Sequence, residues 1–226
     1  MPDLHVLRVF CADDGTGGNP LGVFLDGREV PERDRQPFAT DLGFAETVYV
    51  DNPATGDVRV FTPGEELDFA GHPMLGTAWL LARERDPVDR LHPPAGEVPV
   101  RYESELTFIA GRPAWGPQWE FVRLDAPEQV ESLDGPPEDR PLVAVWAWLD
   151  EDAGAIRERV FGRAIDIVED EATGSAAIRL ATILERPLDI RQGKGSRIVA
   201  RPIGDGMVEV GGRVELDEVR VYPVGG

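Results

Sequence analysis

The 226-residue sequence has very few of the residues that build metal, disulfide and nucleotide sites. Its single cysteine, Cys11, cannot form an internal disulfide, and its three histidines, His5, His72 and His92, are scattered without metal-ligand spacing. We therefore expect no metal site, and we expect Cys11 to be a small buried apolar residue rather than a nucleophile. No G-x-G-x-x-G in a strand–helix context and no G-x-x-x-x-G-K-[ST] is present, so the sequence implies no cofactor.

Positive charge is also scarce. The chain has 23 Lys and Arg against 42 Asp and Glu, a net charge of −19, and Lys194 is its only lysine. Such a field disfavours nucleic acids and anionic membranes as partners. No apolar run reaches the length of a membrane span, and Met1 is followed by Pro-Asp rather than by a basic and then apolar leader. The predicted location is the cytoplasm.

The sequence does have enough apolar residues for a folded core. Hydrophobic residues make up 42% of the chain and five are tryptophan, which excludes a disordered chain and allows one domain or two modest ones. Many strand-like segments alternate with three or four helical ones, predicted over 31–42, 71–85, 152–161 and 175–184. This pattern predicts an α+β architecture.

One stretch, residues 61–78, combines a strand end, a tight turn and a helix start. The helix is predicted to begin at Gly71 and His72, with Pro73 in its first turn, where the missing N–H of proline costs nothing. Such a start directs free backbone N–H groups and the positive end of the helix dipole at whatever lies in front of it. The stretch is therefore a candidate anion-binding element.

Residues 169–181 repeat this pattern half a chain later. When the two segments are aligned with an offset of 103 residues, Gly71 matches Gly174 and His72 matches Ser175. The same offset aligns the rest of the helix. Two such helix starts suggest a duplicated fold whose two lobes direct their helix N-termini at each other across a cleft. The alternative is that small-residue helix starts resemble each other by chance.

Glu46 stands out because it lies among apolar residues at the start of a strand, 44–50. A carboxyl group at the mouth of an apolar pocket has its neutral form favoured, which makes it useful as an acid near neutral pH. The alternative is an outward-facing glutamate. The lobe boundary is predicted at the Gly/Pro/Trp loop, which gives lobes at 1–112 and 113–217, with a last strand in 218–226 that can return to the first lobe.

Several short blocks together resemble the PhzF-like, phenazine biosynthesis-like family. They are Gly18-Asn-Pro20, Glu46-Thr47, Phe61-Thr-Pro63, Glu66 to Ala78, Glu169-Asp170, Ala172-Thr-Gly-Ser-Ala-Ala177 and Gln192-Gly193. The resemblance runs from about Leu4 to the C-terminus. It implies the diaminopimelate-epimerase fold, in which two similar lobes each wrap a β-sheet round a central helix and the active site lies between them.

The resemblance also implies roles for individual residues. Glu46 would be the general acid and base, and His72, Asp170 and Ser175 would line the same cleft as catalytic residues. The matching blocks add Asn19, Gly71, Pro73, Thr173, Gly174 and Gly193 as substrate-binding residues. The family further implies no metal, no cofactor and a tendency to form homodimers.

The chemistry that the resemblance implies is isomerisation of a cyclic hydroxy amino acid, in which one carboxyl group accepts and returns a proton. The two helix starts would hold the substrate carboxylate, and Asp170 could bond an amine or hydroxyl group of the substrate. Related epimerases carry a cysteine at each helix start. Here His72 and Ser175 occupy these places, which excludes two-thiol racemisation.

The sequence departs from the family pattern in several places. The second half is shorter than in typical members, Ala45 precedes the glutamate, and the turn at 193–196 reads Gly-Lys-Gly-Ser. Glu171 replaces a usual proline and adds a third charge beside Glu169 and Asp170. We expect this charge to raise the pKa of a neighbouring carboxyl group or to repel an anionic substrate.

Three alternatives remain open at this stage. The protein could be a non-catalytic small-acid binder that kept the cleft, or a hydrolase that uses Ser175 with His72, although Ala-Thr-Gly-Ser-Ala is not a nucleophile elbow. His72 and Ser175 could also be no more than helix caps, and Asp170 could bond only turn amides. The preferred hypothesis is a cofactor-independent isomerase or epimerase acting on a small carboxylate-bearing metabolite.

Overall fold

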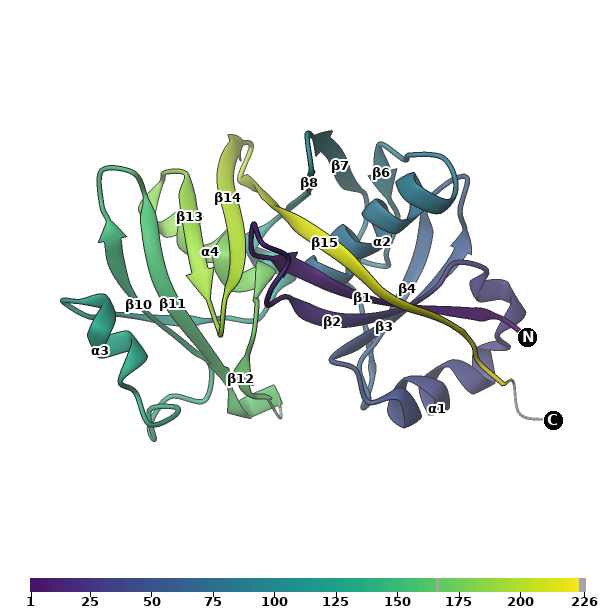
Figure 1. Cartoon of the computed structure of the whole chain (residues 1–226), viewed down its shortest axis with the longest axis horizontal. Helices are drawn as coiled ribbons and strands as arrows, with labels where there is room; N and C mark the ends of the chain where they lie inside the picture. Colours follow the sequence, from purple (N-terminus) through teal and green to yellow (C-terminus); the bar gives the residue numbers. More distant parts are fainter. Residues whose placement is uncertain (166, 224–226) are drawn as a thin grey trace.

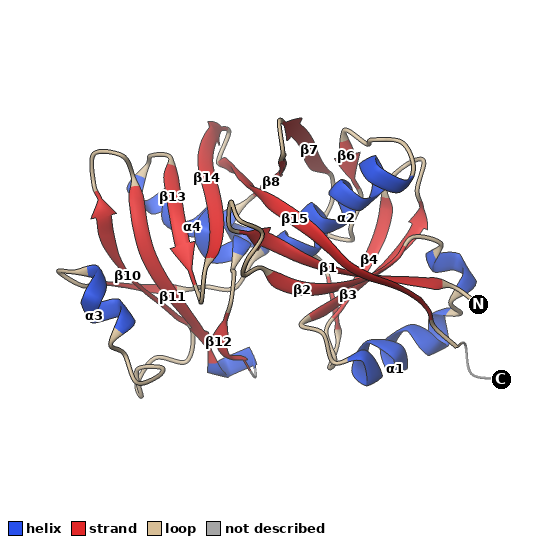
Figure 2. Ribbon diagram, viewed as in Figure 1, coloured by secondary structure: helices blue, strands red, loops and turns tan. Residues whose placement is uncertain are grey.

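The computed structural model describes residues 1–165 and 167–223 and shows two lobes side by side, joined by strands that pass between them (Figure 1). In each lobe a curved sheet surrounds one helix, α2 (Gly71–Glu84) in the first lobe and α4 (Gly174–Leu184) in the second. Helices α1 (Glu32–Leu42) and α3 (Pro127–Glu131) lie on the outside (Figure 2). The predicted α+β fold with two lobes round central helices is confirmed.

The first lobe begins with an antiparallel hairpin that has a long tip. Helix α1 leads from the hairpin to a parallel strand, and two antiparallel strands follow before α2. The strands of this lobe are β1 (Asp3–Cys11), β2 (Asn19–Phe24), β3 (Glu46–Asn52), β4 (Asp57–Phe61), β5 (Glu66–Leu67), β6 (Arg90–Leu91), β7 (Val98–Glu103) and β8 (Leu106–Gly111).

The second lobe repeats this order of pairing. Strands β9 and β10 are parallel and connected through α3, β10 to β12 are antiparallel, and α4 follows. The strands are β9 (Glu120–Arg123), β10 (Val143–Asp150), β11 (Ala155–Gly162), β12 (Ile167–Asp170), β13 (Leu188–Gln192), β14 (Ser196–Gly204) and β15 (Met207–Val221). The shared order supports duplication over chance resemblance.

Strand β15 ties the two lobes together (Figure 1). Its first part pairs with β14 of the second lobe and β8 of the first, and from Arg213 to Val221 it pairs with β1. The segment that returns to the first lobe is therefore longer than the predicted 218–226, of which 224–226 lie outside the described residues. The lobe boundary between 112 and 113 stays a prediction.

One predicted element is wrong. The segment 152–161, predicted as a short helix, contains most of strand β11, which lies between β10 and β13. Its consecutive charged residues 157–159 obscured the strand pattern. In the structure Arg157 is buried and ion-paired with Glu131 of α3, so distant segments compensate a charge that looked solvent-exposed in the sequence.

Helix α2 is buried on most sides, and this burial positions its N-terminus. Leu75, Leu80 and Leu81 are fully buried in the core, which favours folding by about 1.5–3 kcal/mol for each side chain. Gly76 lets the helix approach the sheet closely, because a Cβ there would lie 2.6 Å from Leu21 Cδ2. None of the described helices is long and apolar enough to cross a membrane.

Candidate active site

Glu46 and His72 meet in the first lobe. Glu46 is the first residue of β3 and His72 lies in the first turn of α2. Glu46 Oε2 is 3.2 Å from His72 Nε2, and the side chains are only 14% and 7% exposed. Glu46 is therefore not the outward-facing glutamate of the alternative interpretation.

The imidazole of His72 is neutral. Burial lowers its pKa to about 3, although a hydrogen bond to the backbone of Pro20 acts in the opposite direction. Because proline has no backbone N–H, the accepting group is its carbonyl oxygen and the ring donates. The neutral ring has one N–H, so Nε2 presents a lone pair to Glu46.

The carboxyl group of Glu46 holds its proton at neutral pH. Burial raises its pKa to about 8, and the nearby negative charge of Asp170 adds to the rise. Neither Glu46 Oε2 nor His72 Nε2 has a hydrogen-bond partner among the described residues, and a protonated Glu46 is the donor that would satisfy the Nε2 lone pair. The pKa of Glu46 therefore lies close to neutral pH, and a general acid or base is most effective when its pKa is near the working pH.

Asp170 of β12 comes from the other lobe. Asn19 Nδ2 donates to its Oδ1 over 2.7 Å, and Thr173 Oγ1 donates to its Oδ2 over 2.6 Å. Burial raises the pKa of Asp170 to about 6, while these two hydrogen bonds lower it. Because Asn19 belongs to β2 of the first lobe, its bond to Asp170 crosses from lobe to lobe.

A glutamine that the sequence did not single out orders the acidic turn. Gln192 is fully buried, and its Oε1 accepts the backbone N–H of Thr173 over 2.9 Å. Its Nε2 donates to the carbonyl oxygen of Asp170 and to Thr173 Oγ1. The only sequence signal for Gln192 was its place in a block that resembles the family.

The two helix starts face each other as the duplication predicts. A Cβ added to Gly71 would lie 3.3 Å from the Cα of Gly174, and one added to Gly174 would lie 3.4 Å from the Cα of Gly71. The N-cap residues are Ala70 and Thr173, and neither makes a side-chain capping bond. Both N-termini therefore keep donors and positive dipole ends directed at the junction.

Ser175 is neither a cap nor a paired nucleophile. Its Oγ accepts a hydrogen bond from Trp119 Nε1 over 3.0 Å, and His72 is directed at Glu46 and Pro20 instead. This arrangement lacks the serine–histidine hydrogen bond that a hydrolase needs. Trp119 is a second neighbour of the site that sequence reasoning missed.

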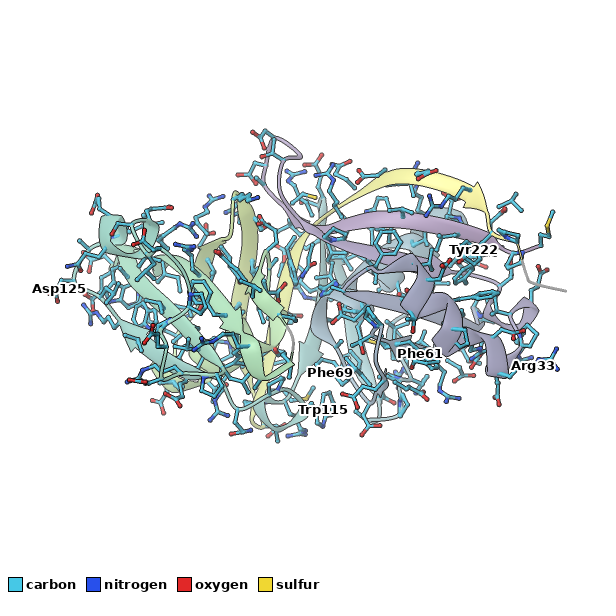
Figure 3. All side chains as sticks on the ribbon, turned by 90° about the horizontal axis from the view of Figure 1, so that it is seen from below. Arg33, Phe61, Phe69, Trp115, Asp125 and Tyr222 are labelled. Carbon is cyan, nitrogen blue, oxygen red and sulfur yellow. The ribbon has the colours of Figure 1, made fainter. Side chains whose placement is uncertain are left out.

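The segment between the lobes covers the junction from one side. Figure 3 shows Phe69 and Trp115 side by side there, with ring centroids 5.3 Å apart. Gly116 lies against Ser175, because a Cβ at this glycine would be 2.7 Å from Ser175 Cβ. The segment between the lobes therefore packs on the start of α4, and its Trp115 lies against Phe69 of the first lobe.

The remaining predicted residues lie around this centre. Pro73 is buried beside His72 in α2, and Gly193 follows Gln192 in a turn behind Asp170, with a φ of 57°. Their roles in substrate binding, like those of Asn19 and Thr173, stay predictions. The described residues contain no group of three or more His, Cys, Asp or Glu side chains that could hold a metal ion.

Sequence comparisons relate the chain to known proteins. Residues 7–112 match the family model of phenazine biosynthesis-like protein, PhzC-PhzF. A trans-2,3-dihydro-3-hydroxyanthranilate isomerase of Pseudomonas aeruginosa is 32% identical over 274 residues, which cover 93% of this chain and 96% of that protein. The protein of the same name from Pseudomonas fluorescens is 31% identical and covers 78% and 80%.

Solved structures share the fold. A PhzF-family protein of Bacillus anthracis has a TM-score of 0.83 at 19% identity and covers 99% of both chains. A hydroxyproline epimerase of Agrobacterium vitis has a TM-score of 0.59 at 13% identity and covers 97% of this chain and 93% of the other. The family model and the two Pseudomonas relatives show that the chain belongs to the phenazine biosynthesis-like (PhzC-PhzF) family and is an isomerase.

Proposed function

We propose that this isomerase moves a proton between two carbon atoms of a small carboxylate-bearing metabolite of a cyclic or amino-acid type, with Glu46 as general acid and base. The observation that carries the proposal is the 3.2 Å contact of Glu46 Oε2 with His72 Nε2 in a buried place near Asp170. The names of the Pseudomonas relatives make a cyclic hydroxy amino acid the first substrate class to test.

The proton balance of this reaction needs only one carboxyl group. Protonated Glu46 gives its proton to one carbon, the electron pair shifts along the conjugated system, and the carboxylate that is left takes a proton from another carbon, which restores the protonated carboxyl group. The pKa of about 8 supports both directions of transfer near neutral pH. We propose that His72 Nε2, which lies 3.2 Å from Glu46 Oε2, accepts a hydrogen bond from the protonated carboxyl group during the reaction and so orients it. We propose that no cofactor takes part.

The facing helix starts support binding of the substrate carboxylate. Gly71 and Gly174 allow the two backbones to approach, and a carboxylate in front of them would meet N–H donors from both lobes. Asp170, held by Asn19 and Thr173, is oriented to accept a hydrogen bond from a substrate amine or hydroxyl group. Binding would then align the substrate carbon with Glu46.

Deuterium uptake tests the proposal. The protein is incubated in D₂O with trans-2,3-dihydro-3-hydroxyanthranilate and a panel of cyclic and α-amino acids, and exchange is followed by mass spectrometry. Glu46→Gln should lower the exchange rate by about 10²–10⁴-fold, because the amide cannot accept and return a proton. Glu66→Gln is the matched control, since Glu66 pairs with Arg59 away from the site.

The outcomes separate an enzyme from a binder. A full exchange rate in Glu46→Gln contradicts the assigned base, and tight binding without exchange across the panel favours the small-acid binder. Full activity in Ser175→Ala would discard a hydrolase that uses Ser175.

The setting of the reaction is also a proposal. We propose that the enzyme acts in the cytoplasm on a free small molecule, without nucleic acid or membrane. A homodimer is supported by the strand edge of β15. Among the described residues, its part from Arg213 to Val221 pairs with β1 alone.

A further inference from the structure

A second contact between the lobes lies directly behind Asp170. The tip of the β1–β2 hairpin, residues 12–18, packs on the turn 193–196 between β13 and β14. A Cβ at Gly17 would lie 2.9 Å from the backbone carbon of Gly195, and Gly17 has a φ of 67°. The two loops therefore touch backbone to backbone.

Ser196 joins the two loops through a hydrogen bond, and Glu171 in turn holds Ser196. The Gly18 N–H donates to Ser196 Oγ over 2.9 Å, and Ser196 Oγ donates to Glu171 Oε1 over 2.9 Å. The Lys194 N–H donates to both oxygens of the same carboxylate, over 2.9 and 3.0 Å. We call Gly18, Glu171, Lys194 and Ser196 the interlobe latch. Ser196 is fully buried, so its two bonds are shielded from water.

The interlobe latch is adjacent in sequence to both residues of the Asn19–Asp170 bond. Gly18 precedes Asn19, and Glu171 follows Asp170. Each residue of the 2.7 Å Asn19–Asp170 bond across the cleft is therefore the sequence neighbour of a latch residue, which restrains its backbone. Glu171 is turned away from the cleft into the turn 193–196, so it does not meet an anionic substrate directly.

We propose that Glu171 is a positioning residue for this reaction: its carboxylate closes the interlobe latch and thereby holds Asp170 in register with Glu46 across the cleft. The inference rests on the proposed function. A displacement of about 1 Å at a reacting group can lower a rate about 10²-fold, so a bond that holds one lobe against the other is relevant to catalysis.

Glu171 also acts on Asp170 through its charge. Burial is the main cause of the raised pKa of Asp170, and the negative charge of Glu171 is a smaller one. Hydrogen bonds from the side chains of Thr173 and Asn19 and from the backbone of Ala172 lower the pKa of this carboxyl group. The titratable group across the cleft is Glu46, whose own pKa is raised by the charge of Asp170.

Two variants separate the charge of the latch from its geometry. Ser196→Ala breaks the latch without changing any charge, and Glu171→Gln leaves one acceptor oxygen for Lys194 and Ser196 to share and also removes the charge. Both should lower kcat for deuterium exchange by about ten- to a hundredfold. Only Glu171→Gln should also move the acid limb of the pH profile to lower pH, because Asp170 then loses a neighbouring negative charge.

The double variant and a control complete the design. Glu171→Gln combined with Ser196→Ala should lose no more activity than the worse single variant, because both changes open the same latch. Glu169→Gln is the matched control, since Glu169 is ion-paired with Arg159 and should leave kcat and the acid limb unchanged.

The result that overturns the inference is unchanged kcat and an unchanged acid limb in both folded variants, with only the melting temperature lowered. If Glu171→Gln does not fold, Ser196→Ala decides alone, because an unchanged kcat in that variant contradicts the latch. Loss of exchange in Glu46→Gln together with normal latch variants rejects only this inference. Normal exchange in Glu46→Gln rejects the proposed function instead.

Discussion

The two lobes have the same arrangement of strands, and one ion pair also occurs at corresponding positions in both. Both contain the tripeptide Arg-Val-Phe, at 59–61 in β4 and at 159–161 in β11. Arg59 binds Glu66 of β5 with Nε and Nη2, and Arg159 binds Glu169 of β12 with the same two nitrogens. The guanidinium groups lie over Phe61 and Phe161, at 6.0 and 5.2 Å from the ring centroids.

The lobes differ where the chemistry is placed. Thr47 pairs with Phe61 and Val143 with Phe161, so Glu46 of the first lobe corresponds to Leu142 of the second. By the ion pairs, Glu66 corresponds to Glu169, and thus Leu67 corresponds to Asp170. Each lobe supplies one carboxyl group at a position where the other has leucine. The candidate active site is therefore shared, and neither lobe alone contains it.

A further difference lies inside the second lobe. Val58 of β4 corresponds to Glu158 of β11, which is fully buried and has neither carboxyl oxygen hydrogen-bonded. Register places Glu158 beside Trp146 and Gln192. The second lobe thus carries a buried polar group that the first lobe does without.

We expect the largest effect when the carboxyl group of the second lobe is replaced by the leucine of the first. Asp170→Leu should lower the exchange rate at pH 7 by about 10²-fold or more, because Asn19 and Thr173 lose their acceptor and the substrate loses a bonding group. Steady-state rates in D₂O measure the loss. A rate within twofold of wild type would contradict a shared site.

Asp170→Asn sharpens this test through pH. The Glu46–Asp170 pair should give a bell-shaped kcat/KM profile with limbs near pH 6 and pH 8, because one shared proton is present only between the two pKa values. Asp170→Asn should lose the lower limb. Its upper limb should move to lower pH, because the charge of Asp170 raises the pKa of Glu46.

Replacing Glu158 with an apolar residue, as in the first lobe, should change stability rather than rate. Burial raises the pKa of Glu158 to about 8, although Arg157 lowers it, so the folded state binds this proton more tightly than the unfolded state. The contribution of Glu158 to stability is complete below the ordinary glutamate pKa of 4.5 and is lost as pH rises toward 8.

Glu158→Leu should therefore raise the free energy of unfolding at pH 8 by about 1–3 kcal/mol. Urea unfolding at pH 5 and pH 8 measures the change, and the gain should be smaller at pH 5. Glu158→Gln is the isosteric control and should also flatten the pH dependence. Parallel pH dependences in wild type and both variants would count against a neutral buried carboxyl group.

The smallest effects are expected at the repeated ion pairs. Glu66→Gln and Glu169→Gln should each lower the free energy of unfolding by no more than about 1 kcal/mol, because both pairs are partly exposed. Glu169→Gln should cost more, since Arg159 is 14% exposed and Arg59 is 36% exposed. Urea unfolding of the two variants compares the pairs, and a larger loss for Glu66→Gln would contradict the ranking.

Much of the frame was predictable from local sequence. The offset of 103 that superposes Gly71 on Gly174 anticipated two facing helix starts, and Glu46 was recognisable because it interrupts an apolar strand. The family resemblance then grouped Glu46 with His72 and Asp170 before any distance was known.

Other features could not be predicted, because they depend on partners far along the chain. Strand β11 was taken for a helix, since the segment that pairs with Arg157 is separated from it in sequence. The sequence around Gln192 and Trp119 does not indicate the hydrogen bonds that they make, Gln192 with Thr173 and Trp119 with Ser175. The expected effect of Glu171 on a carboxyl pKa is present, but its side chain bonds the turn 193–196 instead of facing a substrate.

The amino-acid order was enough to specify the helix starts, because glycine, proline and the apolar period act within a few residues. The 3.2 Å approach of Glu46 to His72 and the bond from Asn19 to Asp170 needed the whole fold. They depend on long-range pairings such as β15 with β1, whose stability comes from burial summed over both lobes. The same burial sets the pKa values of Glu46, His72 and Asp170, so the chemistry of the site exists only in the folded chain.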